Sequence, residues 1–155
     1  MRRAYLSLGS NVGDRAAHLA EGVRLVAAGD AHRVSTVYET EPVGGVVQED
    51  FWNLVVELTT DATPDELLAR AQRAESARRR VRTVPNGPRT LDVDVLWVEG
   101  FASDDPVLTV PHPRMWQRAF VLWPLHELAP DLVSEAERDA GVGRVVALGT
   151  LESLR

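Results

Sequence analysis

The alternation of hydrophobic and polar positions divides most of the chain into strands and helices. Four segments have the period-two pattern or the β-branched composition of strands: residues 4–9, 32–40, 51–60 and 90–98. Two segments between them are typical of helices. The first runs over 15–28 behind the cap residue Asp14, and the second runs from Thr63 to about Arg79 with Pro64 at its first position.

The order of these segments predicts the fold class. It reads β-α-β-β-α-β, the ferredoxin-like α+β pattern, with a hairpin between the second and third strands. We therefore expect a mostly antiparallel sheet with helices packed on it. Additional C-terminal elements follow: an apolar stretch broken by prolines over 107–131, and a weakly patterned tail over 134–155 with a short strand at 145–148. Because no linker divides the chain, we expect a single domain over 1–155.

Composition narrows both the class of protein and the class of ligand. The chain has 155 residues, of which 45% are hydrophobic and none is cysteine, so disulfides and thiolate metal sites are excluded. No apolar run approaches the roughly 20 residues of a membrane span, and a cytoplasmic protein is expected. The net charge of −6 disfavours nucleic acid as a partner, but it leaves room for a small phosphorylated ligand held by a local arginine cluster.

Two carboxylates share one face of the last predicted strand. Asp92 and Asp94 point the same way, while Leu91, Val93 and Val95 point toward the core. Two like charges so close favour a cation between them, and oxygen ligands without cysteine suit Mg²⁺ better than Zn²⁺. The alternative is the solvated face of an edge strand whose aspartates pair with arginines. Spacing alone favours neither interpretation.

Arginines near this carboxylate pair favour the metal. They are Arg78, Arg79, Arg80, Arg82 and Arg89. Guanidinium groups beside a carboxylate pair are what a complex of Mg²⁺ and polyphosphate requires. The simpler interpretation, cations at a solvated helix end, suits Arg78 or Arg79 better than the whole set. A Walker phosphate loop is excluded, because the chain contains no lysine.

Six segments together resemble the 6-hydroxymethyl-7,8-dihydropterin pyrophosphokinases of folate synthesis. They span nearly the whole chain and read YLSLGSNVGDR, TVYETEPVG, FWNLVVEL, GPRTLDVDVL, LTVPHPRM and RAFVLWPLHELAP. Members of that family transfer a pyrophosphoryl group from ATP to the hydroxymethyl group of the pterin and release AMP, in tetrahydrofolate biosynthesis. The resemblance implies the same activity for this chain. It also implies that the chain binds ATP, a reduced pterin and two Mg²⁺ ions, and we expect a monomer.

The resemblance assigns a role to individual residues. Asp92 and Asp94 match the ligands of the two Mg²⁺ ions. The implied catalytic set is Arg80, Arg82, Arg89, Asp92 and Asp94. The positions implied to bind ATP are Gln72, Glu75, Arg80, Arg82, Arg89, Thr109, His112 and Arg118. The positions implied to bind the pterin are Thr40, Val43, Phe51, Asn53 and Phe120.

The pterin positions also make physical sense, although each has a simpler alternative. A flat ring with donors and acceptors on one edge needs aromatic faces and an amide, because unpaired polar edges are costly to bury. Phe51 and Phe120 are such faces, but ordinary core packing explains either one alone. Asn53 lies inside an apolar strand, where the hydrogen bonds of an amide are either satisfied by a turn or made with a ligand. His112 lies between two prolines and could serve only as a loop residue.

The chain departs from the family pattern at a few positions, which leaves two rival functions. Pro85 and Asn86 replace an aromatic and a basic residue, Val107 replaces a basic residue, and Thr40 is followed by Glu41 instead of proline. These changes predict weaker ATP binding or slower loop closure. One rival is a non-catalytic or weakly active pterin-binding relative. The other is a ferredoxin-like nucleic-acid module, which the acidic balance disfavours.

Overall fold

The computed structural model describes residues 1–42, 47–78 and 90–155. Six strands form its main sheet: β1 (Arg2–Ser10), β2 (Ala31–Val34), β3 (Val37–Thr40), β4 (Phe51–Thr60), β5 (Asp92–Val98) and β8 (Val145–Gly149). The order across the sheet is β5-β1-β4-β3-β8, with β2 also paired to β4, and each of these pairs is antiparallel. The predicted ferredoxin-like order and the predicted hairpin are both confirmed.

The strand predicted over 32–40 is two strands, β2 and β3, both paired to β4. Val34 lies opposite Val56 and Tyr38 lies opposite Asn53, so four steps along one strand face three along the other. Ser35 still pairs with Val55, since its amide donates to the Val55 carbonyl at 3.0 Å and its hydroxyl accepts from the Val55 amide at 2.9 Å, so the extra residue lies between Ser35 and Tyr38. This is the geometry of a β-bulge, which the hydrophobic pattern of the sequence does not predict.

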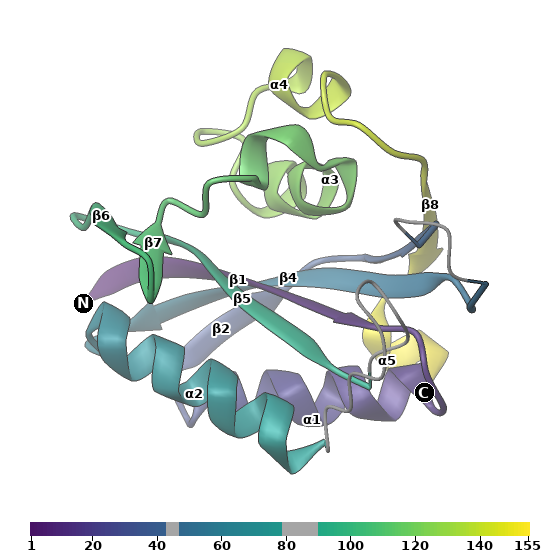
Figure 1. Cartoon of the computed structure of the whole chain (residues 1–155), viewed down its shortest axis with the longest axis horizontal. Coiled ribbons are helices and arrows are strands. Elements are labelled where there is room, and N and C mark those ends of the chain that lie inside the picture. The colour runs from purple at the N-terminus through teal and green to yellow at the C-terminus, as the bar shows by residue number, and fades with distance from the viewer. Residues whose placement is uncertain (43–46, 79–89) are drawn as a thin grey trace.

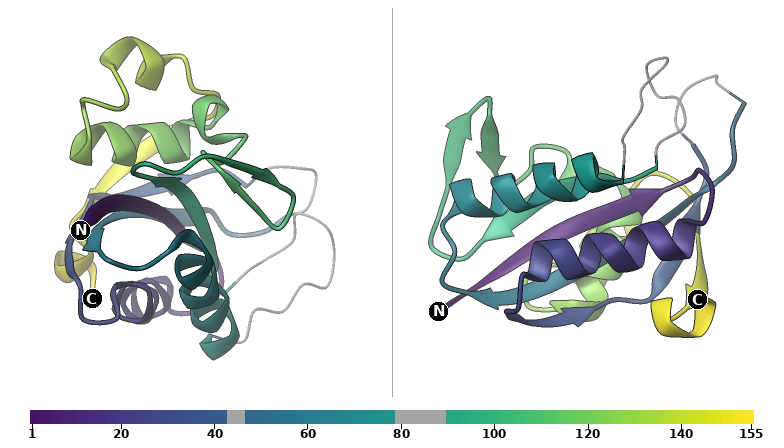
Figure 2. Two further views of the ribbon diagram at one scale, coloured as in Figure 1. Left: turned by 90° about the vertical axis from the view of Figure 1, so that its left-hand side faces the viewer. Right: turned by 90° about the horizontal axis from the view of Figure 1, so that it is seen from below.

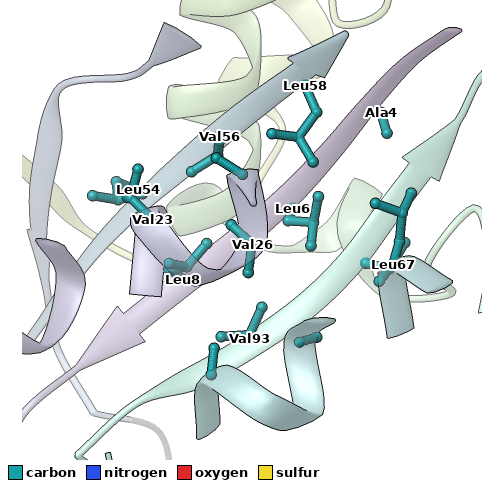
Figure 3. Packing of buried hydrophobic residues seen from close by; sticks show 14 of the residues in the cluster. Ala4, Leu6, Leu8, Val23, Val26, Leu54, Val56, Leu58, Leu67 and Val93 are labelled. Atoms are coloured by element: carbon teal, nitrogen blue, oxygen red, sulfur yellow. The ribbon is translucent and has the colours of Figure 1, made fainter. Parts of the chain in front are cut away.

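The helices α1 (Arg15–Ala27) and α2 (Pro64–Ala77) lie side by side on one face of the sheet (Figures 1 and 2). Both predicted caps are confirmed: the side chains of Asp14 and Thr63 each accept the backbone N–H of the third residue after them. Alternate residues of the central strands face these helices, and together with the buried residues of α1 and α2 they form the first core. Figure 3 shows among them Leu6, Leu8, Val23, Val26, Leu54, Leu58, Leu67 and Val93.

The opposite face of the sheet carries α3 (Ala119–Leu128), preceded by the 3₁₀ turn η1 (Met115–Gln117) (Figure 1). The sequence prediction has no helix here, because Pro124 falls in the middle of the segment. Proline removes the hydrogen bond that residue 124 would donate to the carbonyl of Phe120. Burial compensates, because α3 supplies much of a second core, made of Tyr5, Val55, Leu96, Met115, Val121, Leu122, Leu125, Leu128, Ala129 and Val133.

Short elements complete the fold, and they supply the additional C-terminal structure that the sequence predicts. They are β6 (Ser103–Asp105), β7 (Leu108–Val110), α4 (Glu135–Asp139) and α5 (Leu151–Leu154). The strand expected at 145–148 is β8, which joins the main sheet beside β3. Within the described ranges, none of the helices is long and apolar enough to cross a membrane.

A buried carboxylate ties α3 to the sheet. Glu57 of β4 is 9% exposed and accepts a hydrogen bond from the Tyr5 hydroxyl at 2.7 Å. The Arg33 guanidinium donates to both oxygens of Glu57, at 2.9 and 2.8 Å, and also to the Leu128 carbonyl at the end of α3. Arg33 is therefore the main reason why the pKa of Glu57 lies below its ordinary value, against the opposing effect of burial.

Glu57→Gln is expected to lower the free energy of unfolding by about 2 kcal/mol at pH 7, because Arg33 loses its charged partner. The lowered pKa means that Glu57 stabilises the fold above the unfolded-state pKa of about 4.3, and that this contribution is lost as the pH falls through the folded-state value. Urea unfolding at pH 7 and at pH 3.5 measures the difference between the two proteins. A difference that widened at pH 3.5 would contradict this account.

Candidate active site

A cavity of about 1240 Å³ opens on the sheet where β1, β4 and β5 meet the segment that leads into α3. This volume exceeds the roughly 300–1,000 Å³ of an ordinary ligand pocket, so it has room for two substrates. Ten residues expected from the sequence line it: Thr40, Phe51, Asn53, Gln72, Glu75, Asp92, Asp94, His112, Arg118 and Phe120. The cavity therefore brings together expected residues from three strands, β3, β4 and β5, from the helices α2 and α3, and from the segment that leads into α3.

The other five expected residues lie either outside the described part of the chain or away from the cavity. Val43, Arg80, Arg82 and Arg89 lie outside the described residues. Thr109 is described but does not line the cavity, and its hydroxyl donates to the Asp105 carbonyl at 2.9 Å within the β6–β7 hairpin. Arg78 is also outside the cavity wall: its guanidinium donates to His18 of α1 at 2.9 Å, so it connects the two helices.

The two aspartates lie on the cavity face of β5, an edge strand of the sheet. Val93, which lies between the two aspartates, and Val95, which follows them, are buried in the first core, as predicted. On the neighbouring strand β1, Gly9 lies opposite Asp92 and Ser7 lies opposite Asp94. On the β1 side, therefore, neither aspartate has a large side chain as its cross-strand neighbour.

Glu75 fixes the backbone between the two aspartates. Its carboxylate, on α2, accepts a hydrogen bond from the Val93 amide at 3.0 Å. An edge strand presents unpaired amides on its outer side, and this contact satisfies one of them. The sequence assigns Glu75 to ATP binding, whereas the structure gives its carboxylate a contact that orients the strand carrying Asp92 and Asp94.

His112 and Arg118 supply polar groups on the α3 side of the aspartates. The His112 amide donates to the Leu96 carbonyl at 2.8 Å, which anchors the segment beside β5. The Arg114 amide donates to His112 Nδ1 at 3.2 Å, so the neutral ring carries its proton on Nε2. Burial lowers the pKa of His112 and of Arg118, and in both cases the Asp94 carboxylate opposes that shift. Both side chains are therefore held close to the acidic strand.

The cavity is also lined by an amide, Asn53, and by two aromatic rings, Phe51 and Phe120. Asn53 is 5% exposed, and its Nδ2 donates to the Thr40 hydroxyl at 2.7 Å. Phe51 and Phe120 both line the cavity and are half-buried, and the Arg118 guanidinium carbon lies 5.5 Å from the centre of the Phe120 ring. Phe120 also packs against the second core, so for this ring core packing and ligand contact coexist.

Gly9 makes room for the Asn53 amide. A Cβ atom at position 9 would lie 2.4 Å from Asn53 Oδ1, which is closer than any real contact. The amide oxygen thus lies directly against the backbone of β1, and only glycine permits this approach.

Gly9→Ala is expected to turn the Asn53 amide out of place and to weaken, roughly tenfold or more, binding of the pterin that the sequence resemblance implies as ligand, since a misplaced amide leaves polar edges unpaired. Gly29→Ala is a suitable control, because position 29 has open space around it and a φ of +88°. The control should lose stability without losing affinity. Isothermal titration with the pterin measures both proteins, and equal affinities would show that Asn53 does not need its present position.

Several residues around the cavity are not predicted from the sequence. Asn11 Nδ2 donates to the Glu49 carbonyl at 2.9 Å, and Arg15 donates to the Asp50 carbonyl at 2.9 Å, so both hold the segment that leads into Phe51. The tail also reaches the wall, through Val142, Gly143 and Arg144. Neither set is visible in a hydrophobic pattern, because the contacts depend on backbone atoms far away in the sequence.

Comparisons with known proteins identify the family. The model of the family described as 7,8-dihydro-6-hydroxymethylpterin-pyrophosphokinase (HPPK) matches residues 5–130. The chain belongs to this family. It is 44% identical over 136 residues to the 2-amino-4-hydroxy-6-hydroxymethyldihydropteridine pyrophosphokinase of Bacillus subtilis, covering 86% of this chain and 81% of that protein. It is 47% identical over 140 residues to the enzyme of the same name from Methylorubrum extorquens, covering 88% and 89%.

A solved structure supports the HPPK fold independently. A crystal structure of an HPPK-DHPS in complex with substrates superimposes with a TM-score of 0.63 over 90% of this chain and 42% of that one, at 14% identity. The resemblance drawn from the sequence is thus confirmed. Membership in the HPPK family also favours the enzyme over the non-catalytic relative as the main interpretation.

Proposed function

We propose that this cavity transfers the pyrophosphoryl group of ATP to the hydroxymethyl oxygen of 6-hydroxymethyl-7,8-dihydropterin and releases AMP, a step of tetrahydrofolate biosynthesis. The observation that carries the proposal is that one cavity is lined both by the carboxylate pair of β5 and by the Asn53 amide with the aromatic rings of Phe51 and Phe120. The first suits a metal-bound triphosphate and the second suits a pterin. The family to which the chain belongs performs this reaction.

The pterin binds at Asn53, between Phe51 and Phe120. The Asn53 amide offers a donor and an acceptor to the polar edge of the ring, and the Thr40 hydroxyl holds the amide in orientation at 2.7 Å. The aromatic side chains cover the two faces of the ring, where stacking adds to the burial of apolar surface. Val43, which lies outside the described residues, belongs to this subsite on the basis of the sequence alone.

Asp92 and Asp94 would hold Mg²⁺. Among the described residues, no three acidic or histidine side chains gather as a metal site, so within that part of the chain the ligands available here are these two carboxylates. That number fits Mg²⁺, which takes one or two carboxylates and completes its shell with water and substrate phosphates. Two such ions would neutralise the triphosphate and favour ionisation of the pterin hydroxyl.

The side chains around the carboxylate pair bind and orient ATP. Arg118 and His112 Nε2 donate to phosphate oxygens, and Gln72 contributes a polar contact from α2. Glu75 acts by holding β5 in place. The roles of Arg80, Arg82 and Arg89 toward the charge that develops on the transferred group rest on the sequence.

The transfer forms one bond and breaks one. The pterin hydroxymethyl oxygen bonds to the β-phosphorus, the bond from that phosphorus to the α–β bridging oxygen breaks, and AMP leaves with the bridging oxygen. The hydroxyl proton goes to solvent. We place this reaction in the cytoplasm, in a monomer whose residues 1–155 form a single domain.

Nucleotide analysis tests the reaction directly. The purified chain is incubated with ATP, Mg²⁺ and the pterin, and the nucleotides are separated by chromatography. We expect AMP to appear only when the pterin is present, in an amount equal to the pterin diphosphate formed. Formation of ADP in place of AMP, or no pterin-dependent AMP, would overturn the proposed function.

A further inference from the structure

The tail of the chain takes part in the cavity although it lies beyond the family match. That match ends at residue 130, whereas Val142, Gly143 and Arg144 line the cavity. In Figure 1 the tail leaves α4, passes one end of α3 and continues into β8. This course brings it against the segment that carries Arg118 and Phe120.

Backbone hydrogen bonds join the tail to the start of α3. Val142 and Arg118 form an isolated parallel β-bridge. The Ala119 amide donates to the Val142 carbonyl at 3.0 Å, and the Val142 amide donates to the Gln117 carbonyl at 2.8 Å. The tail therefore contacts the three residues that connect η1 to α3.

These bonds replace the cap that α3 lacks. The first amides of a helix have no partner within the helix, and a side chain at the N-cap ordinarily satisfies one of them. The N-cap of α3 is Arg118, whose side chain makes no capping hydrogen bond. Ala119, the first residue of the helix, instead donates to the tail. The orientation of the first turn, which includes Phe120, thus depends on Val142.

Gly141 allows the tail to approach this closely. A Cβ atom there would lie 2.9 Å from both Ala119 N and Leu122 Cδ1, and 3.0 Å from Ala119 Cα. Two of these three atoms belong to the backbone, which cannot turn aside as a flexible side chain can. The contact therefore requires glycine at position 141.

We propose that residues 141–144 are a positioning element of the active site, which holds Arg118 and Phe120 in the orientation that binds the pterin and ATP. The inference rests on the proposed function for the identity of the ligands. The element acts through its backbone, because the Val142 side chain is 78% exposed.

Two proline substitutions, one in the element and one outside it, test the positioning role. Val142→Pro removes the amide that donates to Gln117, whereas Glu135→Pro puts proline at the first position of α4, where no backbone bond is lost. We expect Val142→Pro to raise the KM for the pterin and its Kd measured without ATP about tenfold, with kcat changed much less, since a small displacement of binding groups has effects of this size. Glu135→Pro should match the wild type.

Gly141→Ala provides a second variant, which decides the question if Val142→Pro does not fold. It should raise the pterin Kd in the same way while the midpoint of thermal unfolding stays within a few degrees of the wild type. An unchanged pterin Kd in a folded Val142→Pro or Gly141→Ala protein would overturn the positioning role. A wild-type protein that makes no pterin-dependent AMP would overturn the proposed function but not the positioning role. In that case the pterin Kd values of the variants and the wild type still decide whether residues 141–144 position the site.

Discussion

Replacing Asp94 with alanine is expected to abolish pyrophosphoryl transfer and to leave pterin binding largely intact. Asp94 lies on the cavity face of β5 together with Asp92, whereas the amide and aromatic residues that suit the pterin lie on other elements. Loss of a metal ligand removes several kcal/mol of transition-state stabilisation, so kcat should fall by about 10³-fold or more.

The measurement is the rate of AMP formation at saturating ATP and Mg²⁺, together with the pterin Kd. Asp104→Ala is the matched control, since Asp104 is an exposed aspartate of the β6–β7 hairpin and does not line the cavity. It should keep the wild-type rate. A near-normal rate in Asp94→Ala would show that the carboxylate pair does not hold the metal.

Replacing Phe120 with alanine is expected to weaken pterin binding by about 10- to 100-fold, because stacking of a ring on an aromatic side chain contributes 1–3 kcal/mol. The ATP affinity should change much less. Isothermal titration calorimetry measures the pterin Kd of the variant, with Phe101→Ala as control. Phe101 is 42% exposed and lies under the Arg2 guanidinium, outside the cavity.

Phe120 also has a structural contact that the experiment must separate from its role in binding. Its ring packs partly against the second core, so Phe120→Ala should lower the unfolding midpoint slightly. A variant that loses stability but keeps the wild-type pterin affinity would mean that Phe120 serves the core alone.

The regular elements of the sheet and the first two helices were predictable from the sequence. Strands β1, β4 and β5 place alternate residues in the first core, which gives each of them a period-two pattern, and residues on the other face of each strand join the second core. Asp92 and Asp94 were recognisable for the same reason: they are charged residues in alternating positions with Val93 and Val95. Periodicity thus located the carboxylate pair and the face on which it lies.

The elements that the sequence did not reveal depend on tertiary contacts. The helix α3 has Pro124 inside it and hydrophobic residues on most of its surface, so neither helical propensity nor periodicity identifies it. The bulge between Ser35 and Tyr38 lies beside a hydrogen bond from the Val55 amide to the Ser35 hydroxyl, a contact that hydrophobic periodicity does not show. The contact between Val142 and Arg118 joins two irregular segments through backbone atoms, and such a pairing leaves no pattern in side chains.

Some of the residues that depart from the family pattern line the cavity, and others do not. Val107 is 74% exposed in the turn between β6 and β7 and does not line the cavity, whereas Glu41 and Pro42 do line it. Pro85 and Asn86 lie outside the described residues. Weaker ATP binding therefore remains a prediction, and the KM for ATP relative to that of a close relative measures it.

The most direct test of the account is a crystal structure of the chain with Mg²⁺, a non-hydrolysable ATP analogue and the pterin. We predict cations at the carboxylates of Asp92 and Asp94, and the pterin between Phe51 and Phe120 with its polar edge on Asn53. A pterin bound elsewhere, or a triphosphate whose cations do not touch the aspartate pair, would contradict the central claim that this one cavity holds both substrates.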